Sequence, residues 1–332
     1  MQTRTLGRGG PTVSALGLGA MGMSGEVYGP ADRAESTATV HAALEAGITL
    51  IDTGDFYATG HNELLLAEAL RGRRRDSYLL SVKFGQLRGP RGEFGGQDSR
   101  PEAVRNFLAY SLTRLGTDYI DIYRPARLDP TVPIEETVGA IKEMVDAGYV
   151  RYVGLSEVDA ETVRRAHAVH PIADVQIEYS LLSRAVEAEV LPTLRELGIG
   201  LTAYAVLGRG LLSGRWTAGH VAGPTDSRGF SPRFARGNVE HNLALVEALR
   251  RVAEAKGCTV AQLAIAWVAA QGSDIVPLVG CRTRTQLAEA VPALELSLST
   301  DDLAEIEKAV PPGSARGDRY PAAFMASLGV GN

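Results

Sequence analysis

Three side chains of complementary chemistry follow two neighbouring apolar segments of the sequence. Asp52 lies near the end of segment 48–54, Lys83 lies near the end of segment 77–84, and Tyr57 follows Asp52 by about one turn. If both segments are adjacent parallel strands, the strand ends place all three side chains together. A lysine buried at such a place needs a counter-ion, and Asp52 is the natural one.

A tyrosine beside a lysine is suited to proton transfer. A nearby cation favours the phenolate, so we expect Lys83 to lower the pKa of Tyr57 from about 10 toward neutrality. Such a tyrosine can act as the general acid for a carbonyl oxygen whose carbon accepts hydride. A buried salt bridge beside a packed tyrosine would produce the same spacing, so the spacing alone leaves both interpretations open.

The elements that must position these side chains alternate regularly along the chain. Segments with helical spacing, many of them ending on a glycine, separate eight short apolar segments. Strand followed by helix, repeated eight times, is typical of a (β/α)8 TIM barrel. With no Pro/Ser-rich linker in the chain, we expect residues 1–332 to form a single barrel domain. The predicted strands are 14–20, 48–54, 77–84, 119–123, 149–157, 173–179, 198–205 and 273–280.

The connections also have predicted places in the barrel. Residues 3–17 contain Gly-Arg-Gly-Gly-Pro between two β-rich runs, which predicts an N-terminal β-hairpin that closes the bottom of the barrel. Segments 21–32, 85–100 and 207–237 are long and irregular, and each follows the C-terminal end of a predicted strand. Barrel enzymes carry their active sites on this face, so we expect the three long loops to surround the site.

Composition excludes several classes of function. The formal net charge is −5, with no basic excess for nucleic-acid binding. Two cysteines, Cys258 and Cys281, are too few for a disulfide framework and fit a reducing cytoplasm. No apolar run has the length of a signal peptide or a membrane helix. His61 and His167 lack partners at metal-ligand spacing, so we expect no metal. The expected partner is a small molecule, and the sequence leaves the oligomeric state open.

Four segments resemble the aldo-keto reductases, and the similarity extends over essentially the whole chain. IDTGDFYATGHNELLLAEAL (51–70) resembles the family signature Asp-Thr-x-x-x-Tyr-x-x-x-x-x-Glu, in which the Asp and Tyr correspond to Asp52 and Tyr57. The resemblance, strongest to bacterial and fungal reductases, implies reduction of aldehydes or ketones with Asp52, Tyr57 and Lys83 as the catalytic group. The other similar segments are EYSLLSR (178–184), AYAVLGRGLLSG (203–214) and GCRTRTQLAEA (280–290).

The resemblance further implies NADPH as the cofactor, extended across the top of the barrel. It places the nicotinamide amide at Ser156 and Gln176, and an aromatic ring against the nicotinamide at Tyr204. The loop over the pyrophosphate begins with Leu207, Gly208, Arg209 and Leu211, where backbone N–H groups suit an anion. Arg282 corresponds to the residue that grips the 2′-phosphate, with Gln286 and Glu289 facing the adenosine. Gly19, Met21, Asp52 and Gly280 complete the expected cofactor-binding set.

The stretch GLGAMG (17–22) matches the Gly-x-Gly-x-x-Gly fingerprint of Rossmann folds. That motif needs a helix starting at its third glycine, but helical spacing here begins only near Asp32. We therefore expect the glycines to end the first barrel strand and to admit the nicotinamide end of the cofactor, with the phosphates held after the seventh and eighth strands.

Two positions depart from the family pattern. Ala126 stands where the family has a histidine that orients the substrate carbonyl, and its loss would slow proton transfer by ~10²- to 10⁴-fold if it contributed as a typical acid–base group. Arg124 shares a strand face with Ala126 and is a better replacement candidate than Arg127. Ala290 replaces an asparagine that contacts adenine, which predicts weaker cofactor binding.

The missing histidine leaves a second function open. A chain that keeps the barrel and the cofactor but lacks this donor could be a catalytically weak NADPH-binding redox sensor or regulatory subunit. For the substrate pocket we expect Tyr28 and Ala126 as lining residues, whereas the identity of the aldehyde or ketone is not encoded in any recognisable motif. The tail 311–332 is expected either to cover the pocket or to join a subunit contact.

Overall fold

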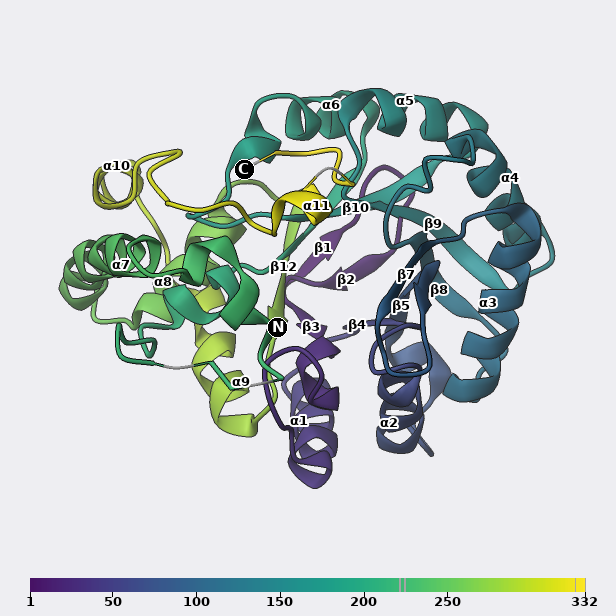
Figure 1. Cartoon of the computed structure of the whole chain (residues 1–332), viewed down its shortest axis with the longest axis horizontal. Coiled ribbons are helices and arrows are strands. Elements are labelled where there is room, and N and C mark those ends of the chain that lie inside the picture. The colour runs from purple at the N-terminus through teal and green to yellow at the C-terminus, as the bar shows by residue number, and fades with distance from the viewer. Residues whose placement is uncertain (221, 224, 326, 332) are drawn as a thin grey trace.

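A closed barrel of eight parallel strands forms the centre of the molecule, as the alternating sequence predicted. The structure, a computed structural model, describes residues 1–220, 222–223, 225–325 and 327–331. The barrel order is β10-β11-β12-β3-β4-β5-β8-β9 (Figure 1). The strands are β3 (Gly17–Gly19), β4 (Leu50–Gly54), β5 (Leu79–Phe84), β8 (Ile120–Pro125), β9 (Val150–Ser156), β10 (Ile172–Glu178), β11 (Gly200–Tyr204) and β12 (Ile275–Gly280).

Helices surround the barrel because most strands are followed by a segment with one apolar face. The helices are α1 (Arg33–Glu45), α2 (His61–Ala69), α3 (Pro101–Leu115), α4 (Ile134–Asp146), α5 (Ala160–Val169), α6 (Val190–Leu197), α7 (Asn238–Ala255), α8 (Val260–Ala270), α9 (Arg284–Ala290), α10 (Thr300–Ala309) and α11 (Ala322–Met325). Helices α7 and α10 lie outside the simple strand–helix repeat that the sequence predicts. Val246 and Leu249 give α7 a buried face, but a scheme of one helix per strand leaves no place for it.

The N-terminal hairpin closes the bottom of the barrel, as predicted. Strands β1 (Thr3–Thr5) and β2 (Thr12–Ser14) pair antiparallel, and in Figure 1 they are seen within the ring of barrel strands. Leu6 and Val13 are buried in an apolar cluster with residues from three barrel strands, namely Leu50, Ile122 and Val276. Burying these side chains at the strand starts excludes water from the lower half of the barrel interior.

A polar layer lies above this apolar one, inside the barrel. Arg124 on β8 is fully buried and forms an ion pair with Asp174 on β10 at 3.0 Å. Gly154 on β9 makes room for it, because a Cβ there would lie 2.9 Å from Ile122 Cγ2 and 3.2 Å from Arg124 Cζ. A buried guanidinium needs such a carboxylate, so the ion pair stabilises both charges inside the barrel. The pair lies below the C-terminal mouth, which is the end of the barrel where the strands finish.

The long loops after β3, β5 and β11 lie at the C-terminal mouth. Of the fingerprint glycines, Gly17 and Gly19 bound β3 and Gly22 follows it. The first α-helix begins only at Arg33, where Asp32 Oδ1 accepts a hydrogen bond from Glu35 N at 2.7 Å. A four-residue 3₁₀ helix, Met21–Ser24, occupies part of the loop, a turn that the sequence analysis did not predict. The loop after β5 forms the hairpin β6 (Gln86–Arg88) and β7 (Phe94–Gln97). Across the described residues, no helix is long and apolar enough to span a membrane.

Candidate active site

An ion pair between Asp52 and Lys83 lies at the centre of the site. The register of β4 and β5 pairs Asp52 with Ser81 and Gly54 with Lys83, which brings the two charged side chains to one end of the barrel. Both are buried, and Lys83 Nζ donates a hydrogen bond to Asp52 Oδ1. The side-chain oxygen Asp52 Oδ2 accepts from Ser81 Oγ and from Gln176 Nε2, each at 2.8 Å. Three donors therefore hold the carboxylate in one orientation.

This carboxylate is connected to the polar layer below it. Arg124 Nη2 donates to Ser81 Oγ at 2.9 Å, and the same hydroxyl donates to Asp52. Arg124 Nη1 donates to Asp174 and to the carbonyl oxygen of Leu155. Burial lowers the pKa of Lys83, and the neighbouring Asp52 opposes that change. The network thus favours the charged form of Lys83 in an environment that otherwise disfavours it.

Tyr57 lies beside the ion pair, as the sequence predicted. Its side chain is buried, with 8% exposed, and Lys83 Nζ lies 5.2 Å from the centroid of its ring. The hydroxyl has no hydrogen-bond partner among the residues described, so it is available to a ligand. The predicted fall in its pKa is wrong for this structure. Burial raises the pKa of Tyr57 well above its usual value, with Asp52 adding to the rise and Arg127 opposing it.

Ala126 lies where the family resemblance predicts a histidine, and its methyl group makes only apolar contacts there. It is fully buried and forms a small cluster with Phe56 and Tyr57, against which Met21 packs. The rings of Phe56 and Tyr57 meet edge to face at 4.8 Å. No hydrogen-bond donor from position 126 reaches Tyr57, because an alanine side chain has none.

The expected replacement, Arg124, does not reach this place. It lies on β8, whereas Ala126 follows the end of that strand, and its guanidinium is bound one layer lower by Asp174 and Ser81. Arg127 lies at the mouth instead, donating to the carbonyl oxygen of Ala126 at 2.6 Å and to the hydroxyl of Tyr320 at 3.3 Å. Strand alternation misjudged Arg127 because β8 ends at Pro125, and the faces of a strand no longer apply beyond its end.

The residues expected around a nicotinamide lie next to this centre. Ser156 ends β9, and its buried Oγ has no hydrogen-bond partner among the described residues. Gln176 on β10 is held by Asp52 through its amide nitrogen. Tyr204 ends β11, and its hydroxyl donates to Glu157 Oε1 at 2.7 Å. An orphaned buried hydroxyl beside a glutamine amide fits a ligand that carries a carboxamide, since burying an unpaired polar group is costly.

The loop expected at the pyrophosphate begins directly after β11. It forms two short 3₁₀ turns within Gly208–Ser213, separated by a kink at Arg209 and Gly210, whose φ values are 58° and 103°. Arg209 pairs with Glu178 at 3.1 Å. Leu211 is fully buried and Leu207 packs against the core, so the apolar side chains anchor the loop while its backbone lies at the mouth.

The residues expected at the adenosine end lie after β12. Arg282 Nη1 donates to the carbonyl oxygens of Tyr28, Gly29 and Pro30, at 2.9, 3.3 and 3.2 Å, which joins this end to the loop after β3. Gln286 accepts a hydrogen bond from the backbone N–H of Arg282, and Glu289 pairs with Arg215. Ala290 is buried. Gly280 pairs in register with Gly19 across β12 and β3, with no atom within 3.9 Å of the Cβ position of Gly280.

The sequence analysis left the C-terminal tail open, and the structure places it at the mouth. The hydroxyls of Tyr320 and Tyr204 lie 3.0 Å apart, and Arg209 lies over the ring of Tyr320 at 3.9 Å. Arg319 is fully buried and binds Glu157 through two hydrogen bonds, at 3.0 and 2.8 Å. No spacing motif marks these contacts, because Tyr204 and Glu157 lie more than 100 positions away from Tyr320 and Arg319 along the chain.

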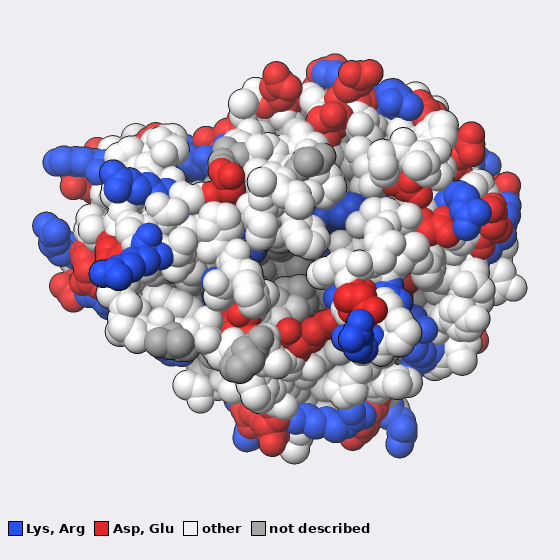
Figure 2. Space-filling model, viewed as in Figure 1, with Lys and Arg blue, Asp and Glu red and all other residues white. Residues whose placement is uncertain are grey.

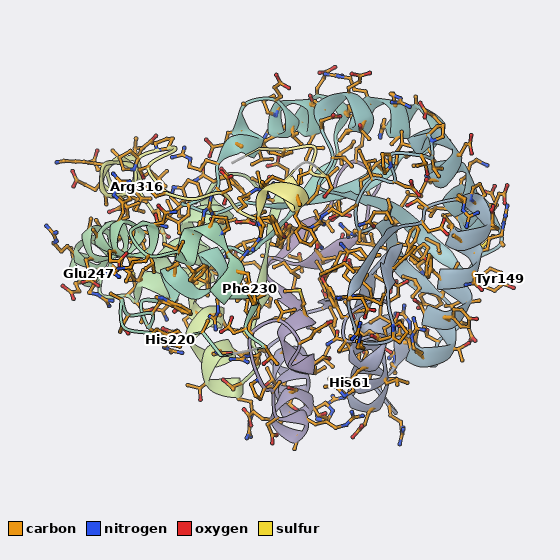
Figure 3. All side chains as sticks on the ribbon, in the orientation of Figure 1. His61, Tyr149, His220, Phe230, Glu247 and Arg316 are labelled. Atoms are coloured by element: carbon orange, nitrogen blue, oxygen red, sulfur yellow. The ribbon has the colours of Figure 1, made fainter. Side chains whose placement is uncertain are left out.

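The surface agrees with a site at the mouth. Figure 2 shows a hollow near the centre of the face viewed in Figure 1, whereas many charged side chains lie over the outer helices. Tyr28, in the loop after β3, is half-buried, with the guanidinium of Arg228 5.2 Å from its ring centroid. The labelled His61 and His220 lie on separate parts of the molecule (Figure 3). Within the described ranges, no group of three or more His, Cys, Asp or Glu side chains is arranged to hold a metal ion.

Comparison with known proteins adds the family. The model of the "Aldo/keto reductase family" matches residues 15–311. A probable aldo-keto reductase from Glycine max is 42% identical over 323 residues, which cover 96% of this chain and 92% of that protein.

Solved structures show the same similarity. A glycerol dehydrogenase from Gluconobacter oxydans has a TM-score of 0.83 and 28% identity, over 94% of this chain and 96% of that one. A thermostable aldo-keto reductase in complex with the inhibitor epalrestat has a TM-score of 0.75 and 26% identity, over 93% and 100% of the two chains. The barrel, the buried strand-end ion pair and these matches together show that the chain belongs to the aldo-keto reductase family, whose members are oxidoreductases that use a nicotinamide cofactor.

Proposed function

We propose that this protein reduces the carbonyl group of an aldehyde or ketone to an alcohol, with NADPH as the cofactor and Tyr57 as the proton donor. The observation that carries the proposal is the buried Asp52–Lys83 ion pair beside the unpartnered hydroxyl of Tyr57. These groups lie at the C-terminal mouth, the face on which barrel enzymes perform their chemistry.

Each member of the group has a distinct task. Tyr57 donates its proton to the carbonyl oxygen as negative charge develops there. Lys83, 5.2 Å from the ring centroid of Tyr57, stabilises the phenolate that remains. Asp52 orients Lys83, and Ser81 and Gln176 in turn orient Asp52. Because Tyr57 is buried and holds its proton firmly, it remains in the acid form until the substrate oxygen is ready to accept that proton.

The groups that surround this centre support the proposed cofactor. When bound, the nicotinamide supplies the hydride that reduces the carbonyl carbon. Ser156 and Gln176 would hold its carboxamide, and Tyr204 would pack against its ring. The loop from Leu207 to Leu211 would cover the pyrophosphate, and Arg282 would bind the 2′-phosphate with the guanidinium geometry that suits phosphate.

The test of this proposal is Tyr57→Phe, which removes one oxygen atom and leaves the ring. Oxidation of NADPH is followed with a panel of aromatic and aliphatic aldehydes and α-keto aldehydes, and cofactor binding is measured separately by fluorescence. We expect the variant to lose at least ~10²-fold in kcat/KM while it binds NADPH as the unmodified protein does. Tyr110→Phe, at an exposed position on α3, is the matched control and should leave the rate unchanged.

Retention of the full rate by Tyr57→Phe would overturn the assignment of the proton donor. Loss of NADPH binding together with activity would instead show that Tyr57 supports the fold or the cofactor site.

Ala126 favours a second candidate, a catalytically weak NADPH-binding redox sensor or regulatory subunit. Position 126 presents a methyl group to Tyr57, so no side chain there can orient a carbonyl oxygen. Tight NADPH binding without turnover of any aldehyde in the panel would favour this candidate. A large gain in rate for Ala126→His would show that the missing donor, rather than the choice of substrates, limits the reaction.

A further inference from the structure

We propose that Arg127 forms an anion subsite beside Tyr57, which selects carbonyl substrates that carry a carboxylate group. The inference rests on the proposed reductase function, because it names the class of substrate that the site would take.

Arg127 is distinguished by what its guanidinium binds. It is partly buried, it follows β8, and its two hydrogen bonds go to the carbonyl oxygen of Ala126 and the hydroxyl of Tyr320. Its side chain forms no ion pair with a described residue. Neutral acceptors leave its positive charge without a directly bonded counter-ion, which makes the guanidinium a ready partner for an anion.

Two arginines close to Tyr320 already have carboxylate partners, whereas Arg282, at the adenosine end of the mouth, binds backbone carbonyl oxygens. Arg209 pairs with Glu178 at 3.1 Å, and Arg319 pairs with Glu157 at 2.8 Å. Glu157 affects the pKa of Arg127 but is not available to it, because the two oxygens of Glu157 accept from Arg319 and one of them also accepts from Tyr204. Glu157 and Glu178 are therefore paired with other arginines, and the guanidinium of Arg127 lies at the mouth without a carboxylate bound to it.

The position of Arg127 connects this charge with the reacting group. The carbonyl oxygen that it binds belongs to Ala126, whose side chain packs against Tyr57. The charge of Arg127 opposes the rise in the pKa of Tyr57 that burial causes, and it adds to the fall in the pKa of Lys83. A substrate whose carbonyl oxygen lies at the Tyr57 hydroxyl thus has a guanidinium near it, and a carboxylate on that substrate gains a charged hydrogen bond.

Tyr320 holds the guanidinium in this place. Its hydroxyl is the acceptor for Arg127 Nη2 and also contacts the hydroxyl of Tyr204, while its ring lies under Arg209. The adjacent Arg319 anchors that part of the tail to Glu157. The tail thereby fixes the orientation of Arg127 before a ligand arrives, which reduces the entropy lost on binding.

The experiment compares two substrates of similar shape that differ in charge, 4-carboxybenzaldehyde and 4-methylbenzaldehyde. For Arg127→Met we expect kcat/KM to fall at least ~10-fold with the carboxylated aldehyde and by less than ~3-fold with the neutral one, because a hydrogen bond to a charged group is lost only with the former. Arg127→Lys keeps the positive charge without the planar guanidinium. Its kcat/KM with the carboxylated aldehyde should lie between the values of the unmodified protein and Arg127→Met. Arg105→Met, on the exposed face of α3, changes the net charge equally and serves as the matched control.

A binding measurement that needs no turnover accompanies the kinetics. Calorimetric titration with 4-methylbenzoate and with 4-methylbenzamide should show that the carboxylate binds more tightly and that Arg127→Met removes the preference. The amide has nearly the same shape and no charge, so it reports packing alone.

The outcomes separate the two proposals. Equal losses for both aldehydes in Arg127→Met, or an unchanged preference for the benzoate, would overturn the anion subsite while the reductase function stands. Benzoate binding that depends on Arg127 in a protein that reduces neither aldehyde would support the subsite as a ligand site and overturn the proposed reductase function.

Discussion

At the scale of single residues, the chemistry of this site depends on where a proton resides. Tyr57 was expected to have a lowered pKa from its neighbour Lys83, but burial and the charge of Asp52 raise it. A cation 5.2 Å from a ring centroid does not offset the loss of water around the hydroxyl when a carboxylate lies close by. The structure therefore keeps Tyr57 protonated in the absence of a ligand, which is the form that a reduction requires.

This protonation state predicts the pH dependence of reduction. Because the pKa of Tyr57 is raised, its proton is retained from neutral to mildly alkaline pH and is lost only above the ordinary tyrosine value of about 10. We expect kcat/KM for aldehyde reduction, measured with saturating NADPH, to show no loss attributable to Tyr57 between pH 6 and pH 9. A descending limb with an apparent pKa of about 7 to 8 would instead indicate that Lys83 or the cofactor lowers the pKa of Tyr57 in the complex.

At the scale of elements, the N-terminal hairpin and the catalytic face lie at opposite ends of the barrel. Leu6 is fully buried among residues from β4, β8 and β12, whereas Lys83 lies next to the C-terminal end of β5 and its partner Asp52 lies at the middle of the short strand β4. The apolar contacts of the hairpin stabilise the strand starts, and the polar layer of Arg124 and Asp174 separates them from the site. The two ends should therefore respond differently to substitution.

Leu6→Ala tests this separation. Removing this buried leucine from the N-terminal hairpin should lower the free energy of unfolding by ~2–5 kcal/mol, measured by denaturant titration. At a temperature where the variant is folded, its kcat/KM should stay close to that of the unmodified protein. Thr3→Ala, at an exposed position of β1, is the control and should change neither quantity. A loss of activity in folded Leu6→Ala would show that the N-terminal hairpin also determines the structure of the catalytic face.

At the scale of the whole molecule, residues from distant parts of the chain meet at the mouth. Arg282 after β12 binds backbone carbonyls of the loop after β3, and Tyr320 of the tail contacts Tyr204 at the end of β11. A ligand that binds across these segments would stabilise the native state as a whole, because it binds the folded mouth and not the unfolded chain.

Thermal unfolding with NADPH and NADH tests this expectation. NADPH at about 100 times its Kd should stabilise the protein by ~2.7 kcal/mol and raise the Tm accordingly. NADH at the same concentration should raise the Tm less, because it lacks the phosphate that we assign to Arg282. In Arg282→Met the difference between the two cofactors should disappear. Equal shifts with both cofactors in the unmodified protein would contradict the assignment of NADPH.

Much of the fold and part of the candidate site follow from local patterns. Eight apolar runs separated by amphipathic segments predict the barrel, because a strand buried on both faces and a helix with one apolar face have distinct periods. The strand ends place Asp52, Tyr57 and Lys83 together, because parallel strands of one barrel end on one face. The hairpin 3–17 was identified in the same way from its glycine-rich turn. The prediction that the glycines at 17–22 belong to a strand end is confirmed for Gly17 and Gly19, whereas Gly22 lies in a short 3₁₀ helix after the strand. As predicted, no α-helix starts before Arg33.

Tertiary structure alone decided which arginine lies near Tyr57 and which protonation state Tyr57 adopts. Arg124 and Arg127 are three positions apart, yet one is paired with Asp174 inside the barrel and the other lies at the mouth without a carboxylate partner among the described residues. Tyr320 reaches the site from the far end of the chain, and the pKa of Tyr57 depends on how completely its neighbours exclude water. The types and order of residues determine which elements form, whereas charge pairing and burial depend on distances between segments that only the closed barrel brings together.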